Sequence, residues 1–398
     1  MDPILFPTAT RLVRPQWSTR VVSPAYDVLR PRDRQELMDR DPYMFLHVTR
    51  SPGDDGGQLS DADVGAENAA ALHRLIAADL FTQVRGPALY LYRLAFGGHV
   101  QTAVVGDVAL SGWADGRIRP HERTREHRTA QMADHLQQLG VSSSPVALGY
   151  RDRSGVDAIV DQVTDGEPLL DFERGDDLEQ TIWEVPAPLT SDLVEAFDEI
   201  VTYVVDGHHR LSAALEVWTR LGAGEAGSRL LCAMFPVSQL QVRSFHRRVT
   251  DLNGLDTDQL LAAIESRGFE VDPVAEGAEP APSTPGRFGM YIDKEWFSLE
   301  CQSAHPSEVD TAVLQRQILG PVLGVDEAAR DGRLEYLPGV AGLAHLVDTT
   351  DGSGGVAFAL HPIPMSQLMA VADAGRTLPP KSTYFEPKTR SGIFVSPR

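Results

Sequence analysis

The chain has 398 residues, with 56 acidic and 36 basic side chains and a formal net charge of −20. This charge argues against sequence-independent binding to nucleic acid or to an anionic membrane, because either partner needs a cationic surface. The length allows a large core divided among roughly two or three domains, or one elaborated domain.

The first polar turn follows a short strand expected over residues 20–22 and has the sequence Ser-Pro-Ala-Tyr-Asp-Val at 23–28. Its carboxylate, Asp27, could ligate magnesium or bind a substrate amine. Alternatively, Tyr26 packs in the loop and Asp27 caps a helix expected over residues 32–39. Both interpretations stay open from the residues alone.

In the next part of the chain, hydrophobic patterns typical of helices alternate with patterns typical of strands. Helical patterns cover residues 67–79, 129–139, 155–163, 193–197 and 208–221. Strand-like runs cover residues 88–95, 104–109, 145–148, 199–205 and 230–236. This alternation predicts a mixed α/β fold.

A histidine, a glutamate and an arginine follow one another in the segment Ile-Arg-Pro-His-Glu-Arg-Thr at 118–124. Glu122, between His121 and Arg123, could act as a general base that deprotonates a substrate hydroxyl, with a pKa set by its neighbours. The commoner role for an acid at such a place is to complement the dipole of a helix start.

A polar turn joins the strand at 199–205 to the helix at 208–221 and reads Asp-Gly-His-His-Arg at 206–210. Glycine before a helix start leaves main-chain N–H groups for a ligand at the positive end of the macrodipole, and Arg210 adds donors. The turn therefore predicts a phosphate site. In the alternative, Asp206 is the N-cap and Arg210 an exposed helix residue.

The C-terminal part divides into a linker and a smaller module. We expect an N-terminal and central α/β region over 1–272, a Pro- and Ala-rich linker over 273–286 and an α/β module over 287–398. A hairpin is expected from 287–292 and 295–299 around Asp293-Lys294, and helices at 310–319 and 366–374. The tail at 379–392 gathers cations and hydroxyls that could wrap a phosphate or carboxylate, and Ser-Phe-His-Arg-Arg at 244–248 is a weaker cationic group.

The sequence disfavours several kinds of site, as well as secretion and membrane association. The chain has no P-loop, no Gly-x-Gly-x-x-Gly opening a helix and no His-Glu-x-x-His, and adjacent histidines would diverge on a helix rather than share a zinc ion. Cys232 and Cys301 lack metal-ligand spacing, so we expect reduced, buried thiols in a cytoplasmic protein. No secretory signal and no run of about 18 apolar residues is present, so no membrane association is expected.

Five segments, in this order, resemble a family of domains of unknown function, DUF1015. They are Ser-Pro-Ala-Tyr-Asp-Val at 23–28, Pro-His-Glu-Arg-Thr at 120–124, Asp-Gly-His-His-Arg at 206–210, Phe-His-Arg at 245–247 and Pro-Lys-Ser-Thr-Tyr-Phe-Glu-Pro-Lys at 380–388. The resemblance implies an α/β (α+β) fold with a ParB/sulfiredoxin-like nucleotide-binding core, similar to the free-serine kinases. His208 stands where sulfiredoxins have their reactive cysteine, which excludes sulfinic-acid reduction.

The resemblance also implies roles for individual residues. Catalysis is assigned to Glu122, Asp206 and His209, with Asp206 also a magnesium ligand. Binding of the nucleotide, ATP or ADP, is assigned to Gly207, His208, His209, Arg210, Lys381 and Lys388. Binding of the acceptor is assigned to Tyr26, Asp27, His121, Thr124, His246, Arg247, Ser382 and Thr383.

The implied function is that of a nucleotide-dependent small-molecule kinase acting on free L-serine or a similar hydroxyl-bearing metabolite. The alternative is a non-catalytic nucleotide-binding switch of ParB-like type. No helix-turn-helix with a basic face is present, so nucleic acid is not an expected partner. Self-association is left open by the sequence.

Overall fold

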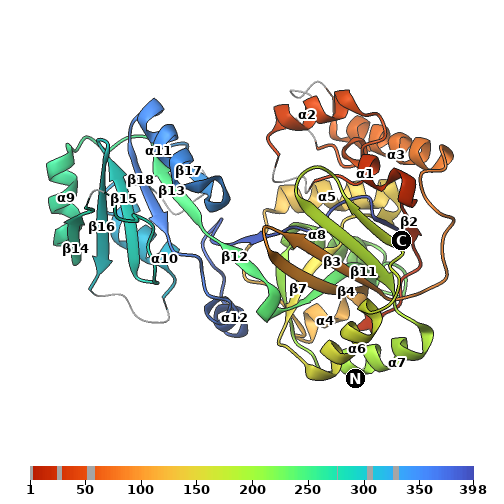
Figure 1. Cartoon of the computed structure of the whole chain (residues 1–398). Coiled ribbons are helices and arrows are strands. Elements are labelled where there is room, and N and C mark those ends of the chain that lie inside the picture. The colour runs from red at the N-terminus through yellow and green to blue at the C-terminus, as the bar shows by residue number, and fades with distance from the viewer. Residues whose placement is uncertain (1–2, 25–28, 52–58, 276, 303–307, 326–330) are drawn as a thin grey trace. The chain divides into compact units, whose positions relative to one another are not determined.

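The computed structural model describes residues 3–24, 29–51, 59–275, 277–302, 308–325 and 331–398. The chain forms two compact units (Figure 1). Unit 1 comprises Met1–Pro120, Thr124–Leu240 and Pro387–Arg398, and unit 2 comprises His121–Arg123 and Gln241–Glu386. The C-terminal end of the chain therefore belongs to unit 1.

Unit 1 is built on a mixed sheet with the strand order β5-β10-β7-β11-β4-β3-β9-β8, and β1 pairs with β4. The strands are β1 Leu5–Phe6, β3 Tyr90–Phe96, β4 His99–Ala109, β5 Ile118–Arg119, β7 Val146–Tyr150, β8 Leu170–Glu173, β9 Leu178–Glu184, β10 Thr202–Asp206 and β11 Arg229–Pro236. Strand β10 runs parallel to β5 and antiparallel to β7. The expected mixed α/β fold is confirmed, and the ParB/sulfiredoxin-like label stays a prediction.

The helices of unit 1 are α1 Ser18–Val21, α2 Pro31–Arg40, α3 Asp61–Ala77, α4 Ser111–Ala114, α5 Glu126–Leu139, α6 Ser154–Thr164, α7 Ala187–Phe197 and α8 His208–Arg220. Helix α3 begins earlier than expected because Ser60 is its N-cap and accepts the N–H of Asp63. The strand expected at 20–22 is wrong. Pro15 starts a helical turn there that continues into α1, and two consecutive valines are too few to impose a strand.

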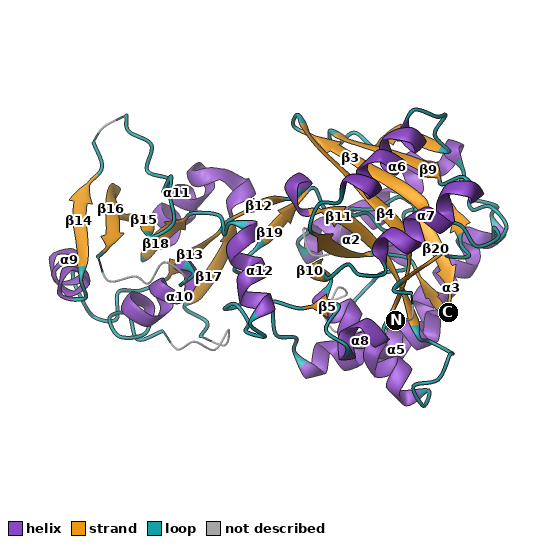
Figure 2. Ribbon diagram, turned by 90° about the horizontal axis from the view of Figure 1, so that it is seen from below, coloured by secondary structure: helices purple, strands orange, loops and turns teal. Residues whose placement is uncertain are grey.

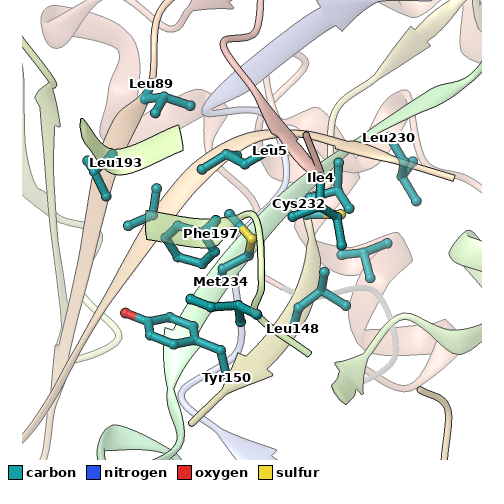
Figure 3. Close-up of a cluster of buried hydrophobic side chains, with 14 of the residues drawn as sticks. Ile4, Leu5, Leu89, Leu148, Tyr150, Leu193, Phe197, Leu230, Cys232 and Met234 are labelled. Carbon is teal, nitrogen blue, oxygen red and sulfur yellow. The ribbon is translucent and has the colours of Figure 1, made fainter. Parts of the chain in front are cut away.

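The main core lies between the sheet and helices on it. Figure 3 shows Phe197 of α7 beside Met234 and near Tyr150 of the sheet, and Leu193 of the same helix belongs to the same buried cluster. The rings of Tyr150 and Phe197 meet edge to face at 5.0 Å between centroids. Cys232 is buried in the same core, which raises the pKa of its thiol, whereas Cys301 is only half-buried. Helices α5 and α8 pack side by side through Ala133, Ala213 and Val217 (Figure 2).

A small sheet joins the two ends of the chain within unit 1. Its order is β2-β20-β6, formed by β2 Arg11–Leu12, β20 Phe394–Pro397 and β6 Val141–Ser142. Ile393 and Phe394 are fully buried, so the tail is part of the core of this unit rather than a surface appendage.

Unit 2 has an antiparallel sheet of order β14-β16-β15-β18-β13-β17 and a two-stranded ribbon, β12-β19. The strands are β12 Gln241–Arg243, β13 Phe245–Val249, β14 Phe269–Pro273, β15 Arg287–Ile292, β16 Glu295–Cys301, β17 Leu334–Pro338, β18 Val356–Leu360 and β19 Tyr384–Glu386. The helices are α9 Thr257–Ser266, α10 Asp310–Leu314, α11 Gly342–Ser353 and α12 Met365–Asp373, with a π-helical turn at Gln315–Leu319.

The expected hairpin is confirmed in β15 and β16. Asp293 and Lys294 both have positive φ, 49° and 68°, as a tight two-residue hairpin turn requires. The Pro-rich stretch lies between β14 and β15 inside unit 2. The regions expected over 1–272, 273–286 and 287–398 would have to be tested by expressing them separately, so these boundaries stay predictions. Within the described ranges, no helix is long and apolar enough to cross a membrane.

Candidate functional site

The turn between β10 and α8 is the centre of the candidate site. Strand β10 ends at Asp206, Gly207 adopts φ 98°, and α8 begins at His208. Gly207 is the N-cap, with no side chain capping the helix. The alternative in which Asp206 caps α8 is therefore wrong, and its carboxylate points to other partners.

Two cations flank that carboxylate. The guanidinium of Arg210 pairs with Oδ2 of Asp206, and the ammonium of Lys388 donates to Oδ1 at 2.8 Å. Burial alone would raise the pKa of Asp206, but Lys388 and Arg210 outweigh it and hold the pKa of this carboxyl well below its ordinary range. Asp206 is thus ionised and one net positive charge remains in the cluster.

Arg210 is held firmly and is not an exposed helix residue. Its Nη1 donates to the main-chain carbonyls of Ser144 and Pro145, at 2.9 and 2.8 Å. A Cβ placed on Gly207 would lie 2.9 Å from Nε and Nη2 of the same guanidinium. Glycine is therefore required both by the positive φ and by the guanidinium that lies over its α-carbon. Among the described residues, three of the five N–H donors of Arg210 are used, which leaves two for a ligand.

Lys388 reaches Asp206 because the tail is fastened on both sides of it. The side-chain amide of Gln101 donates to the carbonyl of Pro387 at 2.9 Å. Thr389 donates to the carbonyl of Pro145 at 3.3 Å, the same carbonyl that Arg210 uses. The tail and the turn before β7 thus share one hydrogen-bonding group.

His209 and Thr124 connect α8 to the segment after β5. The Nε2 atom of His209 accepts the main-chain N–H of Arg125 at 3.1 Å, which places the ring proton on Nδ1. The hydroxyls of Thr124 and Ser212 are 3.3 Å apart. Within unit 1, Thr124 and Arg125 are therefore held against the first turns of α8.

In unit 2, the expected residues His121, Ser382 and Thr383 lie together. Nε2 of His121 is 3.1 Å from the hydroxyl of Thr383. The hydroxyl of Ser382 is 2.9 Å from that of Thr311 on α10 and donates to the carbonyl of Pro379. The half-buried Glu122 is grouped with this unit.

His246, Arg247 and Lys381 also belong to unit 2. His246 accepts the N–H of Leu360 on Nδ1 at 3.2 Å, and burial, aided by the charge of Arg247, lowers its pKa to about 4. Arg247 donates to the carbonyls of Phe245 and Pro380. His246 is therefore neutral at pH 7 and Arg247 carries the charge.

The predicted residues thus form two groups, one in each unit. Unit 1 brings together Thr124, Asp206, Gly207, His208, His209, Arg210 and Lys388; unit 2 holds His121, Glu122, His246, Arg247, Lys381, Ser382 and Thr383. Tyr26 and Asp27 lie outside the described residues. The sequence reasoning missed the carbonyls of Ser144 and Pro145, whose only signal is a Ser-Ser-Ser-Pro turn before a strand.

The described residues do not build a cage for magnesium. Both oxygens of Asp206 already accept hydrogen bonds from cations, and no group of three or more His, Cys, Asp or Glu residues within the described ranges could hold a metal ion. Magnesium usually keeps several waters and is bound through few carboxylates and the phosphates of a substrate. The assignment of Asp206 as a magnesium ligand stays a prediction that these contacts do not support.

Solved structures with some likeness to the chain include a free serine kinase variant in complex with AMP and another with ADP. Each has a TM-score of 0.40 and 16% identity over 73% of this chain and 91% of the other. A C-terminally truncated SbnI from Staphylococcus aureus has a TM-score of 0.40 and 12% identity over 73% and 87%. No curated protein matches the chain. The family model described as protein of unknown function (DUF1015) matches residues 6–321, and the chain belongs to this family.

Proposed function

We propose that unit 1 binds a nucleotide by its phosphates at the turn between β10 and α8. The observation that carries this proposal is the convergence of Arg210 and Lys388 on one carboxylate at the start of a helix whose N-cap is glycine. A helix start combined with excess positive charge favours phosphate. In a chain of net charge −20, two cations gathered at one turn favour a role in binding an anion there.

Asp206 acts in this proposal as a positioning residue. It orients both cations by accepting one hydrogen bond from each, so neither side chain must be ordered when the phosphate arrives. The phosphate oxygens then accept hydrogen bonds from the two remaining N–H groups of Arg210. The ammonium group of Lys388 contacts both Asp206 and the phosphate.

The proposed reaction is transfer of a phosphoryl group to a small hydroxyl-bearing acceptor, with free L-serine the first candidate from the family resemblance. The acceptor oxygen forms a bond to the terminal phosphorus of ATP or ADP, and the bond from that phosphorus to the bridging oxygen breaks. Glu122 would accept the hydroxyl proton, a role that only the family resemblance assigns to it. Magnesium, carried on the nucleotide, would neutralise phosphate charge.

Binding is tested first, by calorimetric titration of ATP, ADP and AMP into the wild type and into Arg210→Gln. We expect roughly a tenfold or greater loss of affinity in this variant, since charge-assisted hydrogen bonds are lost. Arg220→Gln is the matched control, because Arg220 lies on the same helix and contacts the side chains of Asp134, Gln137 and Glu216 at the surface of unit 1. Equal affinities in all three proteins would refute the nucleotide site.

Transfer is tested separately by phosphorus NMR with nucleotide, magnesium and L-serine, threonine or homoserine. O-Phosphoserine should form with the wild type and not with Glu122→Gln, which should still bind nucleotide. Absence of any phosphorylated acceptor would refute the kinase but not the nucleotide site.

A regulatory nucleotide-binding protein is the second candidate. It is favoured by the contacts of two residues expected to be catalytic, since Asp206 is engaged by two cations and Nε2 of His209 accepts a main-chain N–H. A nucleotide-dependent change in sedimentation or in partner binding, without a phosphorylated product, would support this candidate over the kinase.

A further inference from the structure

Two consecutive arginines of β13, Arg247 and Arg248, are both buried but differ in their partners. Both are almost inaccessible, with exposed fractions of 3% and 1%. Because neighbours on a strand point to opposite faces, the two side chains enter different surroundings. Arg248 meets a carboxylate, Glu335, at 2.7 Å and also donates to the carbonyl of Gly354.

Arg247 has no such counterion within the described part of the chain. Its hydrogen bonds go to main-chain carbonyls, those of Phe245 at 2.6 Å and Pro380 at 3.2 Å, and its guanidinium stacks on the ring of Tyr336 at 4.8 Å. These contacts satisfy two of its five donors and leave its charge uncompensated. Burial lowers the pKa of Arg247 to about 10, so the group is still charged at pH 7.

The surroundings of Arg247 make that charge costly. Its register partners are Tyr336 on β17 and Phe358 on β18, and Phe358 belongs to the apolar core of unit 2. An isolated charge in apolar surroundings is unfavourable unless it is paired. A ligand that supplies the missing negative charge would remove this cost.

A second cation lies next to Arg247. Lys381 directly follows Pro380, whose carbonyl accepts from Arg247, and its Nζ lies 5.2 Å from the centre of the Phe245 ring. Lys381 also has a positive φ of 55°, a conformation that residues other than glycine rarely adopt. No carboxylate of the described residues pairs with Lys381 either, although acidic residues outnumber basic ones in the chain. Strain of this kind is retained where the surrounding structure fixes it, often at a functional site.

We propose that unit 2 contains an oxyanion site in which Arg247 and Lys381 bind the carboxylate or phosphate group of a small molecule. The planar guanidinium offers its remaining donors to two oxygens of the anion, and the ammonium of Lys381 adds a point charge. Tyr336 and Phe245 hold the two cations by their ring faces. The residues of this site all belong to unit 2, and the proposal does not rest on the nucleotide site proposed for unit 1.

The test uses the full chain in an Arg210→Gln background, which weakens phosphate binding in unit 1. Arginine side chains labelled with nitrogen-15 are titrated with inorganic phosphate or sodium acetate at constant ionic strength, with chloride as the reference salt. The Nε–H resonance of Arg247, assigned by its loss in Arg247→Gln, should move saturably with at least one of the two anions. Movement with phosphate alone identifies a phosphate-bearing ligand, and movement with acetate a carboxylate-bearing one.

A second measurement compares matched variants by thermal unfolding in the same background. The anion should raise the midpoint of unfolding, since a ligand bound only by the folded state stabilises it. Arg247→Gln should abolish the rise, and Arg248→Gln should retain it because Arg248 has its own carboxylate. If the Arg247 resonance does not move with either anion, or if the rise survives in Arg247→Gln, the oxyanion site is refuted. Failure of nucleotide binding in the wild type would leave this result unaffected.

Discussion

Lys388 donates a hydrogen bond to Asp206 across 182 residues of sequence, with 2.8 Å between Nζ and Oδ1. The contact exists because the C-terminal residues return to unit 1 and pair there as β20 with β2 and β6. One ammonium group therefore serves both the fold and the candidate site.

Replacing Lys388 by methionine should weaken nucleotide binding by roughly tenfold or more, since it removes a charge that phosphate would share. Stability should fall by about 1–3 kcal/mol, because Asp206 loses one of the two cationic side chains that donate hydrogen bonds to it. Calorimetric titration and urea unfolding measure the two effects. Lys294→Met, in the β15–β16 turn, is the control and should leave nucleotide affinity unchanged; a similar loss in both variants would contradict a specific role for Lys388.

The ionisation of Asp206 predicts a distinct pH dependence of stability. Its pKa in the folded protein lies below the ordinary value of 3.8, so the stabilisation by its ion pairs is complete above that value and is lost as the pH falls through the lower range. Asp206→Asn should therefore be less stable than the wild type by about 2–4 kcal/mol at pH 7. The difference should narrow below about pH 4. Urea unfolding from pH 7 to pH 3 checks this, and two parallel curves would contradict it.

Gly207→Ala should combine a conformational cost with a displacement of Arg210. The positive φ of 98° costs about 1 kcal/mol for a residue with a Cβ, and the new methyl group would lie 2.9 Å from the guanidinium. Gly222→Ala is the matched control at the other end of α8. It has φ 84° but nothing within 4 Å of the added carbon. Both variants should lose stability, and only Gly207→Ala should lose nucleotide affinity, as titration would show.

Asp310 of unit 2 should destabilise the protein at neutral pH. Burial raises the pKa of this carboxyl to about 6, although the N–H of Gly286 and the nearby His361 oppose the shift. A raised carboxyl pKa means that the folded state binds more protons, so its contribution to stability decreases as the pH rises from about 4 to about 6.

Asp310→Asn keeps an oxygen for the N–H of Gly286 and removes the buried charge. The variant should therefore be more stable than the wild type by about 2–3 kcal/mol at pH 7.5 and similar to it at pH 4. Chemical unfolding at the two pH values measures this. An equal difference at both would show that the effect is not ionisation.

Local patterns predicted the turn at the candidate site, and distant contacts completed it. A β-branched strand, a glycine and an amphipathic helix are all short-range signals, and β10, Gly207 and α8 follow them. By contrast, the sequence cannot indicate that Lys388 meets Asp206 or that Arg210 reaches the carbonyl of Ser144, because such contacts depend on how separate elements pack.

Strand β13 shows the same limit. The sequence indicates a weaker cationic group at 244–248, and the structure shows that every residue of β13, which covers 245–249, is buried. Inside the unit Arg248 pairs with Glu335, its register partner on β17, and a partner 87 residues away leaves no local pattern. At the short helix α1 a local pattern was misleading instead, since two consecutive valines suggested a strand.

The tail should control the candidate site through packing as well as through charge. Phe394 is fully buried against the rings of Tyr90 and Tyr92, with centroids at 5.5 and 6.2 Å, and Phe394→Ala should cost about 3–5 kcal/mol. Because the tail also positions Lys388, the same variant should weaken nucleotide binding. Phe358→Ala, equally buried in the core of unit 2, is the control.

The control Phe358→Ala should lose a similar amount of stability and keep nucleotide affinity, since its core does not hold the tail. Urea unfolding and calorimetric titration at a temperature where both variants are folded provide the comparison. Retained affinity in Phe394→Ala would mean that Lys388 reaches the site without the packed tail, because Gln101 and Thr389, which anchor the residues beside it, would then suffice.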